Sequence, residues 1–213
     1  MSEVILRRRS DGALELRVNG VFVMDDVETS SERLLARRVL DLGAREVLVG
    51  GLGLGYTLRE LLAHDSVTRV VVAEIHPEIL AWMRDDILPG ADLLADTRTT
   101  IVVEDVRQVV EAQPRASLDA ICLDVDNGPD FLVHDQNARL YRPDFIAMCA
   151  ARLRSDGHLA IWSMSRSASL IATLGAAFAH VEETDVAVRL QGRAEHYWVL
   201  TGSRPLLADT VAS

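Results

Sequence analysis

Acidic residues follow three consecutive predicted strands at the point where each strand ends. Glu74 closes the strand Val70–Ala73, Asp105 follows the next strand, and Asp124 and Asp126 follow the one after that. In an open α/β sheet, ligands bind beyond the carboxyl ends of the strands. Carboxylates at that edge can accept hydrogen bonds, attract a cation or take a proton from a nucleophile. One such acid is common on a solvated surface, but three in succession indicate a ligand site.

A glycine turn follows the buried strand that comes just before these three. The apolar run Val47–Val49 stops at glycine, and a helix is predicted to begin directly after the turn. The turn itself alternates Gly51, Gly53 and Gly55. A turn of this kind lets a ligand approach backbone N–H groups closely. Glu74 ends the next strand, roughly 20 residues on, where an acid accepts hydrogen bonds from a ribose diol. Together these features predict a nucleoside-binding site.

The spacing of the glycines favours one class of nucleoside. The dinucleotide fingerprint is G-x-G-x-x-G, whereas this chain has G-x-G-x-G, with Tyr56 where the third dinucleotide glycine would fall. The turn also holds no basic residue for a pyrophosphate. We therefore expect an S-adenosylmethionine (SAM) type of nucleoside rather than NAD or FAD, and a glycine turn without any ligand is the third alternative.

Predicted strands and helices alternate through most of the chain. This alternation is typical of an α/β fold in which helices cover both faces of a parallel sheet. We expect a mainly parallel seven-stranded sheet with an antiparallel C-terminal hairpin. The expected organisation is a short N-terminal β unit over residues 1–28, a Rossmann-like domain over 29–203 and a tail over 204–213. The predicted strands cover 46–50, 69–74, 100–103, 118–123, 158–162, 181–189 and 195–202.

Composition narrows the choice of partners and compartment. The 213 residues contain 32 acids against 22 Lys plus Arg, a net charge of −10, which argues against binding to nucleic acid or an anionic membrane. Cys122 and Cys149 lie in predicted core elements, as free thiols of a reducing compartment do. With no signal peptide or membrane span in the sequence, we expect a cytoplasmic protein. The six histidines show no metal-ligand spacing, so no metal site is expected.

The successive motifs resemble those of the spermidine synthase family. The resemblance rests on VLVGGLGLGYTLREL, VVVAEIHPEIL, VVEDVRQVV and LDAICLDVDNGPD, and it runs from about residue 14 to 163. It implies a class I methyltransferase-type Rossmann fold with a small N-terminal β domain. It also implies that Glu74 binds the ribose hydroxyls, that Asp105 contacts the adenine amino group and that Asp124 deprotonates the attacking amine.

The chain departs from this family at positions that would handle the amine groups. Family members have an acid within the glycine turn, which holds the amine of the aminopropyl group, and Leu54 fills that position here. The second acid of the loop after the fourth strand comes one place early, as Asp126, and Asn127 fills its slot. Nor does the stretch that would line the polyamine site offer the family's Gln and Tyr-His pair. The residues expected to bind the nucleoside therefore match the family pattern, whereas most of those expected to bind the polyamine do not.

These departures lead us to expect methyl transfer. A sulfonium is already an activated electrophile, so the protein must orient a nucleophile and remove its proton. We expect Asp124, with Asp126, to act as that base on a small amine or hydroxyl acceptor. Methyl transfer from SAM needs room for the methionine carboxylate, which an acid at position 54 would repel and Leu54 would not. The residues expected to bind the donor are Gly51, Gly53, Gly55, Glu74, Asp105 and Asp124.

Three alternatives remain open on the sequence alone. The first is aminopropyl transfer from decarboxylated SAM. The family resemblance supports it, as does the acidic loop over residues 124–135, which holds four aspartates and no Lys or Arg. The second is another displacement at the sulfonium, either aminocarboxypropyl transfer or intramolecular ring closure. The third is a nucleoside-binding module without catalysis. The acidic loop favours a cationic amine as acceptor, and the resemblance implies a homodimer, because the family's N-terminal β unit often mediates assembly.

Overall fold

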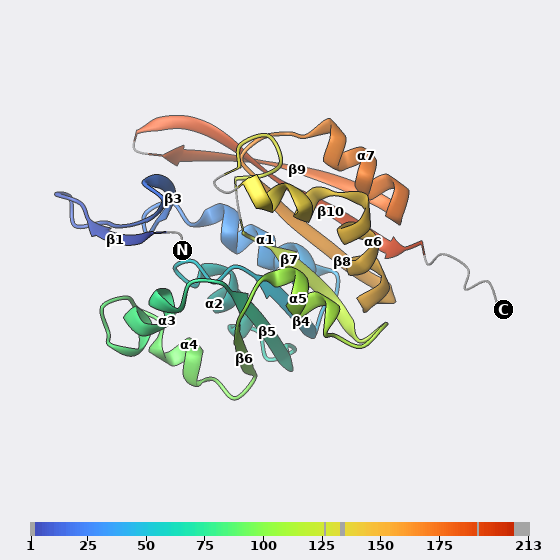
Figure 1. Cartoon of the computed structure of the whole chain (residues 1–213), viewed down its shortest axis with the longest axis horizontal. Helices are drawn as coiled ribbons and strands as arrows, with labels where there is room; N and C mark the ends of the chain where they lie inside the picture. The colour runs from blue at the N-terminus through green and yellow to red at the C-terminus, as the bar shows by residue number, and fades with distance from the viewer. Residues whose placement is uncertain (1–2, 126, 133–134, 191, 207–213) are drawn as a thin grey trace.

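A mainly parallel seven-stranded sheet forms the centre of the protein (Figure 1). The structure is a computed structural model that describes residues 3–125, 127–132, 135–190 and 192–206. The strand order in the sheet is β6-β5-β4-β7-β8-β10-β9. The bounds are β4 (Glu46–Gly50), β5 (Arg69–Glu74), β6 (Thr99–Val103), β7 (Leu118–Leu123), β8 (Leu153–Ser163), β9 (Phe178–Leu190) and β10 (Arg193–Pro205).

The order of the strands reverses at β4. This strand pairs in parallel with β5 on one side and with β7 on the other, so that Gly50 lies opposite both Ala73 and Leu123. The reversal opens a crevice beyond the carboxyl ends of β4 and β7, which is where open α/β sheets bind ligands. The antiparallel hairpin of β9 and β10 extends the sheet beyond β8. The predicted fold class is thus confirmed.

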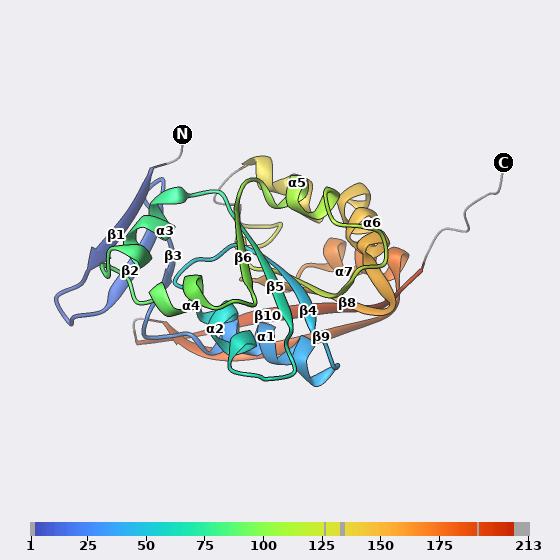
Figure 2. The same ribbon diagram turned by 90° about the horizontal axis from the view of Figure 1, so that it is seen from below.

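Helices cover both faces of this sheet, as Figure 2 shows for α5 and α6 on one face and α1 and α2 on the other. Alternate residues of β4 point to opposite faces, as they must in a strand: Val47 and Val49 pack in one apolar cluster and Leu48 in the other. The helices are α1 (Ser30–Asp41), α2 (Tyr56–Leu62), α3 (Pro77–Arg84), α4 (Ala91–Ala95), α5 (Val106–Glu111), α6 (Pro143–Arg152), α7 (Ala168–Ala177) and the short 3-10 helix η1 (Asp135–Tyr141). None of the helices in the described ranges combines the length and apolarity that a bilayer span requires.

A separate three-stranded antiparallel sheet precedes the large one. It consists of β1 (Val4–Arg8), β2 (Leu14–Val18) and β3 (Val21–Asp25), and Asn19 and Gly20 form the hairpin turn between β2 and β3, both with positive φ. The small sheet lies at the end of the molecule where α3 is found (Figures 1 and 2). The thioether of Met24 on β3 contacts the glycine turn, since its sulfur accepts the N–H of Leu54 at 3.3 Å. The small sheet therefore closes over the ligand edge of the large one.

The structure differs from the sequence prediction in short or irregular segments. The sequence pattern predicts no strand over residues 4–8 and a loop over 87–98, where the structure has β1 and α4. It also predicts a helix to about Leu153 and a turn over 155–157. Strand β8 nevertheless begins at Leu153, and its pairing with β7 changes register between Leu118 and Ala120. An element of about five residues has too few turns or alternations to give a periodic signal, and this explains the first two differences.

Candidate functional site

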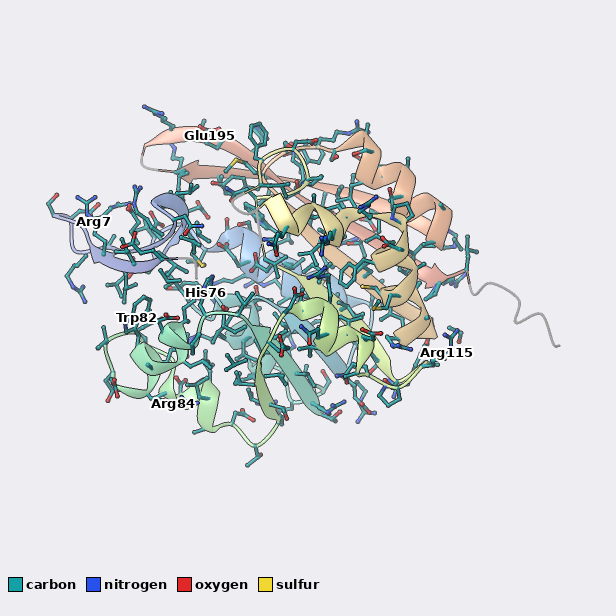
Figure 3. All side chains as sticks on the ribbon, viewed as in Figure 1. Arg7, His76, Trp82, Arg84, Arg115 and Glu195 are labelled. Atoms are coloured by element: carbon teal, nitrogen blue, oxygen red, sulfur yellow. The ribbon has the colours of Figure 1, made fainter. Side chains whose placement is uncertain are left out.

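One cavity of about 650 Å³ lies at the carboxyl edge of the sheet. Its wall combines the small N-terminal sheet, the start of α1 and the ends of β4, β5, β6, β7 and β8. The volume is within the range of pockets that hold small molecules. His76, labelled in Figure 3, borders the cavity on the side of the small sheet. Five acids border it as well, namely Glu32, Glu74, Glu104, Asp105 and Asp124.

Gly51 brings bare backbone to the floor of the cavity. Its φ is +88°, and a Cβ added to it would lie 2.1 Å from the carbonyl oxygen of Asp124. No side chain fits at this position, so glycine is required both by the backbone conformation and by the close approach of the neighbouring strand end. Gly53 also borders the cavity, whereas Gly55 turns the chain into α2 with a φ of +86°. The glycine turn thus leaves space for a ligand directly above the end of β4.

Glu74 connects the glycine turn to the end of β5. The side chain is only 4% exposed, yet it borders the cavity. Its Oε2 accepts the N–H of Leu52 at 2.9 Å, and its Oε1 accepts the N–H of His76 at 2.8 Å. Each carboxylate oxygen keeps a further lone pair, because an ionised carboxylate has about four acceptor sites. The carboxylate is therefore fixed in place and still able to accept hydrogen bonds from a diol in the cavity.

Asp105 has a structural task at the start of α5. Its side chain caps that helix by accepting the N–H of Arg107 at 2.9 Å. The guanidinium of Arg107 also binds the carboxylate, with Nη2 2.5 Å from Oδ2, and holds the pKa of Asp105 below its usual range. Asp105 borders the cavity as expected, but its contact with an adenine amino group remains a prediction.

Asp124 lies at the end of β7, where it is held from two directions. Its N–H donates to the carbonyl of Gly50 at 2.8 Å, and its Oδ2 accepts the hydroxyl of Thr57 at 3.0 Å. Burial raises the pKa of this carboxyl above its ordinary value, and the hydrogen bond from Thr57 partly offsets the rise. A carboxylate with a raised pKa at the cavity wall is suited to take a proton from a bound nucleophile.

Glu32, on the first turn of α1, is an acid that the sequence analysis did not select. It is 7% exposed and borders the cavity. Its Oε2 accepts the hydroxyl of Ser31 at 2.7 Å, and no ion pair joins it to any residue in the described part of the chain. Burial, followed by the charge of nearby Asp124, raises the pKa of Glu32. A sequence signal did exist: Glu32, Leu35, Ala36 and Val39 share one buried helix face at helical spacing, and an acid there is unusual.

Leu54 faces the protein core and not the ligand. Its side chain is 4% exposed and packs in the apolar cluster that also contains α1 and α2. The residues of the turn that border the cavity are Gly51 and Gly53. Leu54 consequently does not make room for a methionine carboxylate, and its identity gives no support to methyl transfer.

The remaining predicted site residue is Asp126, and three further residues of the wall lie outside the predicted set. Asp126 lies outside the described residues. Asn127, next to it, is buried and borders the cavity, as do Met24 and Trp162. These residues come from a loop, from the small sheet and from β8, three segments that are distant in the sequence. Only the folded arrangement brings them together with Glu74 and Asp124.

Comparison with known proteins identifies the family that this chain resembles in sequence. The family model described as "Spermine/spermidine synthase domain" matches residues 34–172, more than half of the chain. A polyamine aminopropyltransferase of Mycobacterium tuberculosis is 32% identical over 164 residues, which cover 75% of this chain and 30% of that protein. Polyamine aminopropyltransferase 2 of Pseudomonas aeruginosa is 32% identical over 151 residues, covering 64% of this chain and 40% of that protein. The chain thus spans well under half the length of these two curated relatives.

Solved structures show the same fold. A spermidine synthase in complex with the transition-state analogue AdoDATO has a TM-score of 0.83 at 18% identity, covering 96% of this chain and 71% of that one. The spermidine synthase of Thermotoga maritima has a TM-score of 0.79, also at 18% identity, covering 96% and 70%. The expectation of methyl transfer is wrong, because the matching family model is named for spermine and spermidine synthases and the curated relatives are named for aminopropyl transfer.

Proposed function

Because the chain belongs to the spermine/spermidine synthase family, we propose that it is an aminopropyltransferase. The donor in this proposal is decarboxylated SAM, and the acceptor is an amine. The observation that carries the proposal is the convergence of Gly51, Glu74 and Asp124 on one cavity at the strand reversal. The three positions supply, in order, open backbone for a close ligand approach, acceptors for a ribose diol and a base.

The donor would lie across the ends of β4 and β5. Its ribose hydroxyls would donate to Glu74, whose oxygens are already aligned by the N–H groups of Leu52 and His76. The side chain of Ile75, which is 59% exposed and borders the cavity, offers an apolar surface for the adenine ring. The sulfonium would then lie over Gly51, with its aminopropyl arm toward Asp124. Holding both reactants in this orientation contributes up to about 7–11 kcal/mol to lowering the barrier.

Asp124 is the base in this mechanism. It takes a proton from the acceptor ammonium, and the freed lone pair of the nitrogen attacks the sulfonium-bound carbon of the aminopropyl group. The new N–C bond forms as the C–S bond breaks, and the bonding pair stays on sulfur, which becomes a neutral thioether. The product nitrogen is a secondary ammonium, and Asp124 releases the proton it took to solvent, which regenerates the base. A positioned carboxylate base contributes about 10²–10⁴ in rate.

The charge of the wall favours an amine over a neutral acceptor. Glu32, Glu104 and Asp124 border the cavity, and none of the three has an ion pair with a described residue. Carboxylates in a partly enclosed cleft raise the local concentration of cationic ligands. A diamine therefore suits this cavity better than an alcohol or an acid.

The test is product analysis by mass spectrometry. Purified protein is incubated with decarboxylated SAM and, in turn, 1,3-diaminopropane, 1,4-diaminobutane and spermidine, with SAM replacing the donor as a control. We expect an aminopropylated amine and 5′-methylthioadenosine, and no product from SAM. Asp124→Asn should lower the turnover by about 10²–10⁴ and leave nucleoside binding intact. A methylated amine formed from SAM, or no product from any pair, would refute the proposal.

A further inference from the structure

We propose that Glu32 selects the donor: its carboxylate binds the terminal ammonium of the aminopropyl arm and repels the carboxylate that SAM carries beside the same nitrogen. This inference rests on the proposed aminopropyl transfer. The glycine turn of this chain has no acid for the aminopropyl ammonium, because position 54 is a leucine that packs into the core. Glu32 on α1 supplies that negative charge instead.

The location of Glu32 supports this role. The carbonyl oxygen of Glu32 is 3.3 Å from the hydroxyl of Thr57, and that same hydroxyl lies 3.0 Å from Asp124. Thr57 belongs to the first turn of α2, directly after the glycine turn. Glu32 is therefore anchored beside the end of the turn and next to the proposed base. In the donor, the terminal nitrogen is only three carbons from the sulfonium, so it must also lie near Asp124.

The other acids of the cavity are engaged elsewhere. Glu74 accepts two backbone N–H groups at the end of β5, and Asp105 is paired with Arg107. Glu104 accepts the side chain of Gln108 and the N–H of Asp105 at the end of β6, which β5 and β4 separate from β7 and Asp124. Asp124 is assigned to the acceptor nitrogen. Glu32 is the remaining carboxylate of the described cavity wall, and two ammonium groups meet there in the reaction.

The surroundings of Glu32 indicate that a cation belongs beside it. A carboxylate that is more than nine-tenths buried without a cationic partner is costly, and burial accordingly raises its pKa. The wall thus keeps an anion without a cation among the described residues. The ammonium of a bound ligand would complement it.

The chemistry of the two possible donors makes the inference selective. SAM and decarboxylated SAM share the nucleoside, the sulfonium and the terminal nitrogen, and they differ only in the carboxylate. An acid near that nitrogen attracts both ammonium groups, but it also faces the extra negative charge of SAM. Like charges repel each other strongly in a site of low dielectric constant. One buried carboxylate can therefore favour decarboxylated SAM without any contact to the nucleoside.

Isothermal calorimetry of the full chain tests this directly. Three ligands are compared: decarboxylated SAM, SAM and 5′-methylthioadenosine, which lacks the aminopropyl arm. For Glu32→Gln we expect Kd for decarboxylated SAM to rise about 10- to 100-fold, the loss of one charge-assisted hydrogen bond. Kd for SAM should stay equal or fall, and Kd for 5′-methylthioadenosine should not change. Glu32→Met should give the same pattern, and Glu111→Gln, an exposed acid at the end of α5, should not alter any of the three.

The outcomes separate this inference from the proposed function. If unaltered protein prefers decarboxylated SAM and Glu32→Gln keeps that preference, the role of Glu32 is overturned and the transferase proposal stands. The same holds if the variant changes only KM for the amine, since Glu32 would then bind the acceptor. If unaltered protein binds none of the three ligands, the proposed function itself fails.

Discussion

The hydroxyl of Thr57 lies 3.0 Å from Oδ2 of Asp124 and donates a hydrogen bond to it. This contact joins the first turn of α2 to the end of β7, so it fixes the proposed base relative to the glycine turn. It also stabilises the carboxylate form of Asp124, and it is the cause that lowers a pKa otherwise raised by burial.

Replacement of Thr57 by valine should therefore disturb the base without moving it. The variant keeps the shape of the side chain and loses the hydrogen bond, so the pKa of Asp124 should rise further. We expect the acid limb of the pH profile of kcat/KM to move to higher pH. On that limb the rate should fall about 10- to 100-fold, as expected for the loss of one hydrogen bond to a charged group. Thr57→Ser keeps the hydroxyl and serves as the control; identical profiles for all three proteins would contradict the assignment.

Glu74→Gln should weaken donor binding. The glutamine amide keeps one oxygen that can accept a backbone N–H. It lacks the negative charge of the carboxylate to which the ribose hydroxyls would donate. Because hydrogen bonds to charged groups contribute about 1.5–3 kcal/mol, Kd for 5′-methylthioadenosine should rise about 10- to 100-fold. Calorimetry provides the measurement, with Glu78→Gln, an exposed acid on α3, as the matched control. An unchanged Kd would mean that the ribose lies elsewhere.

Gly51→Ala should be damaging both to the fold and to the site. The residue has a φ of +88°, and the added methyl would lie 2.1 Å from the carbonyl oxygen of Asp124. The backbone strain alone is about 1–3 kcal/mol. We expect a lower melting temperature together with loss of donor binding. Gly43→Ala is the control, since that glycine also has a positive φ but has open space around it; equal effects on binding would contradict the role of the turn.

Leu54→Asp should destabilise the protein without improving donor binding. The side chain is 4% exposed within an apolar cluster, so the substitution removes apolar packing and buries an unpaired charge. We expect a loss of at least about 3 kcal/mol in the free energy of unfolding, measured in urea. Leu54→Met should be close to neutral. Tighter binding of decarboxylated SAM by Leu54→Asp would show that the side chain reaches the ligand after all.

The free energy of unfolding should depend on pH, because burial shifts the pKa values of two acids of the site. Burial raises the pKa values of Glu32 and Asp124 in the folded protein above their values in the unfolded chain. Their stabilising effect is fully present below the ordinary carboxyl pKa of about 4. It is lost as the pH rises through the raised values. Relative to unaltered protein, Glu32→Gln should therefore gain melting temperature between about pH 4 and pH 8. A difference that stays constant with pH would contradict this prediction.

The sequence predicted the elements whose signals are local. The apolar run before Gly51, the alternating glycines and the acid that closes β5 are consecutive features of the chain, and the structure brings Glu74 and Asp124 to one cavity as expected. The fold class followed from the β-α alternation, because parallel strands need helical crossovers.

The parts that could not be predicted depend on directions in space. Glu32 reaches the cavity because α1 packs against the first turn of α2, a contact between segments that the sequence does not pair. Leu54 points into the core from a turn in which its neighbours Gly53 and Gly55 both have positive φ. The direction of a side chain in such a turn depends on these backbone angles, which the sequence does not reveal. The methyl-transfer interpretation failed at this step: it assumed that an acid for the aminopropyl group had to come from the turn.

The central claim is that an adenosyl sulfonium lies over Gly51 with its ribose on Glu74 and its reactive carbon toward Asp124. A crystal structure of the protein with 5′-methylthioadenosine and 1,4-diaminobutane tests it most directly. The claim predicts both ribose hydroxyls within about 3 Å of the Glu74 oxygens and an amine nitrogen between the sulfur and Asp124. A nucleoside bound outside this cavity, or one whose ribose points away from Glu74, would contradict it.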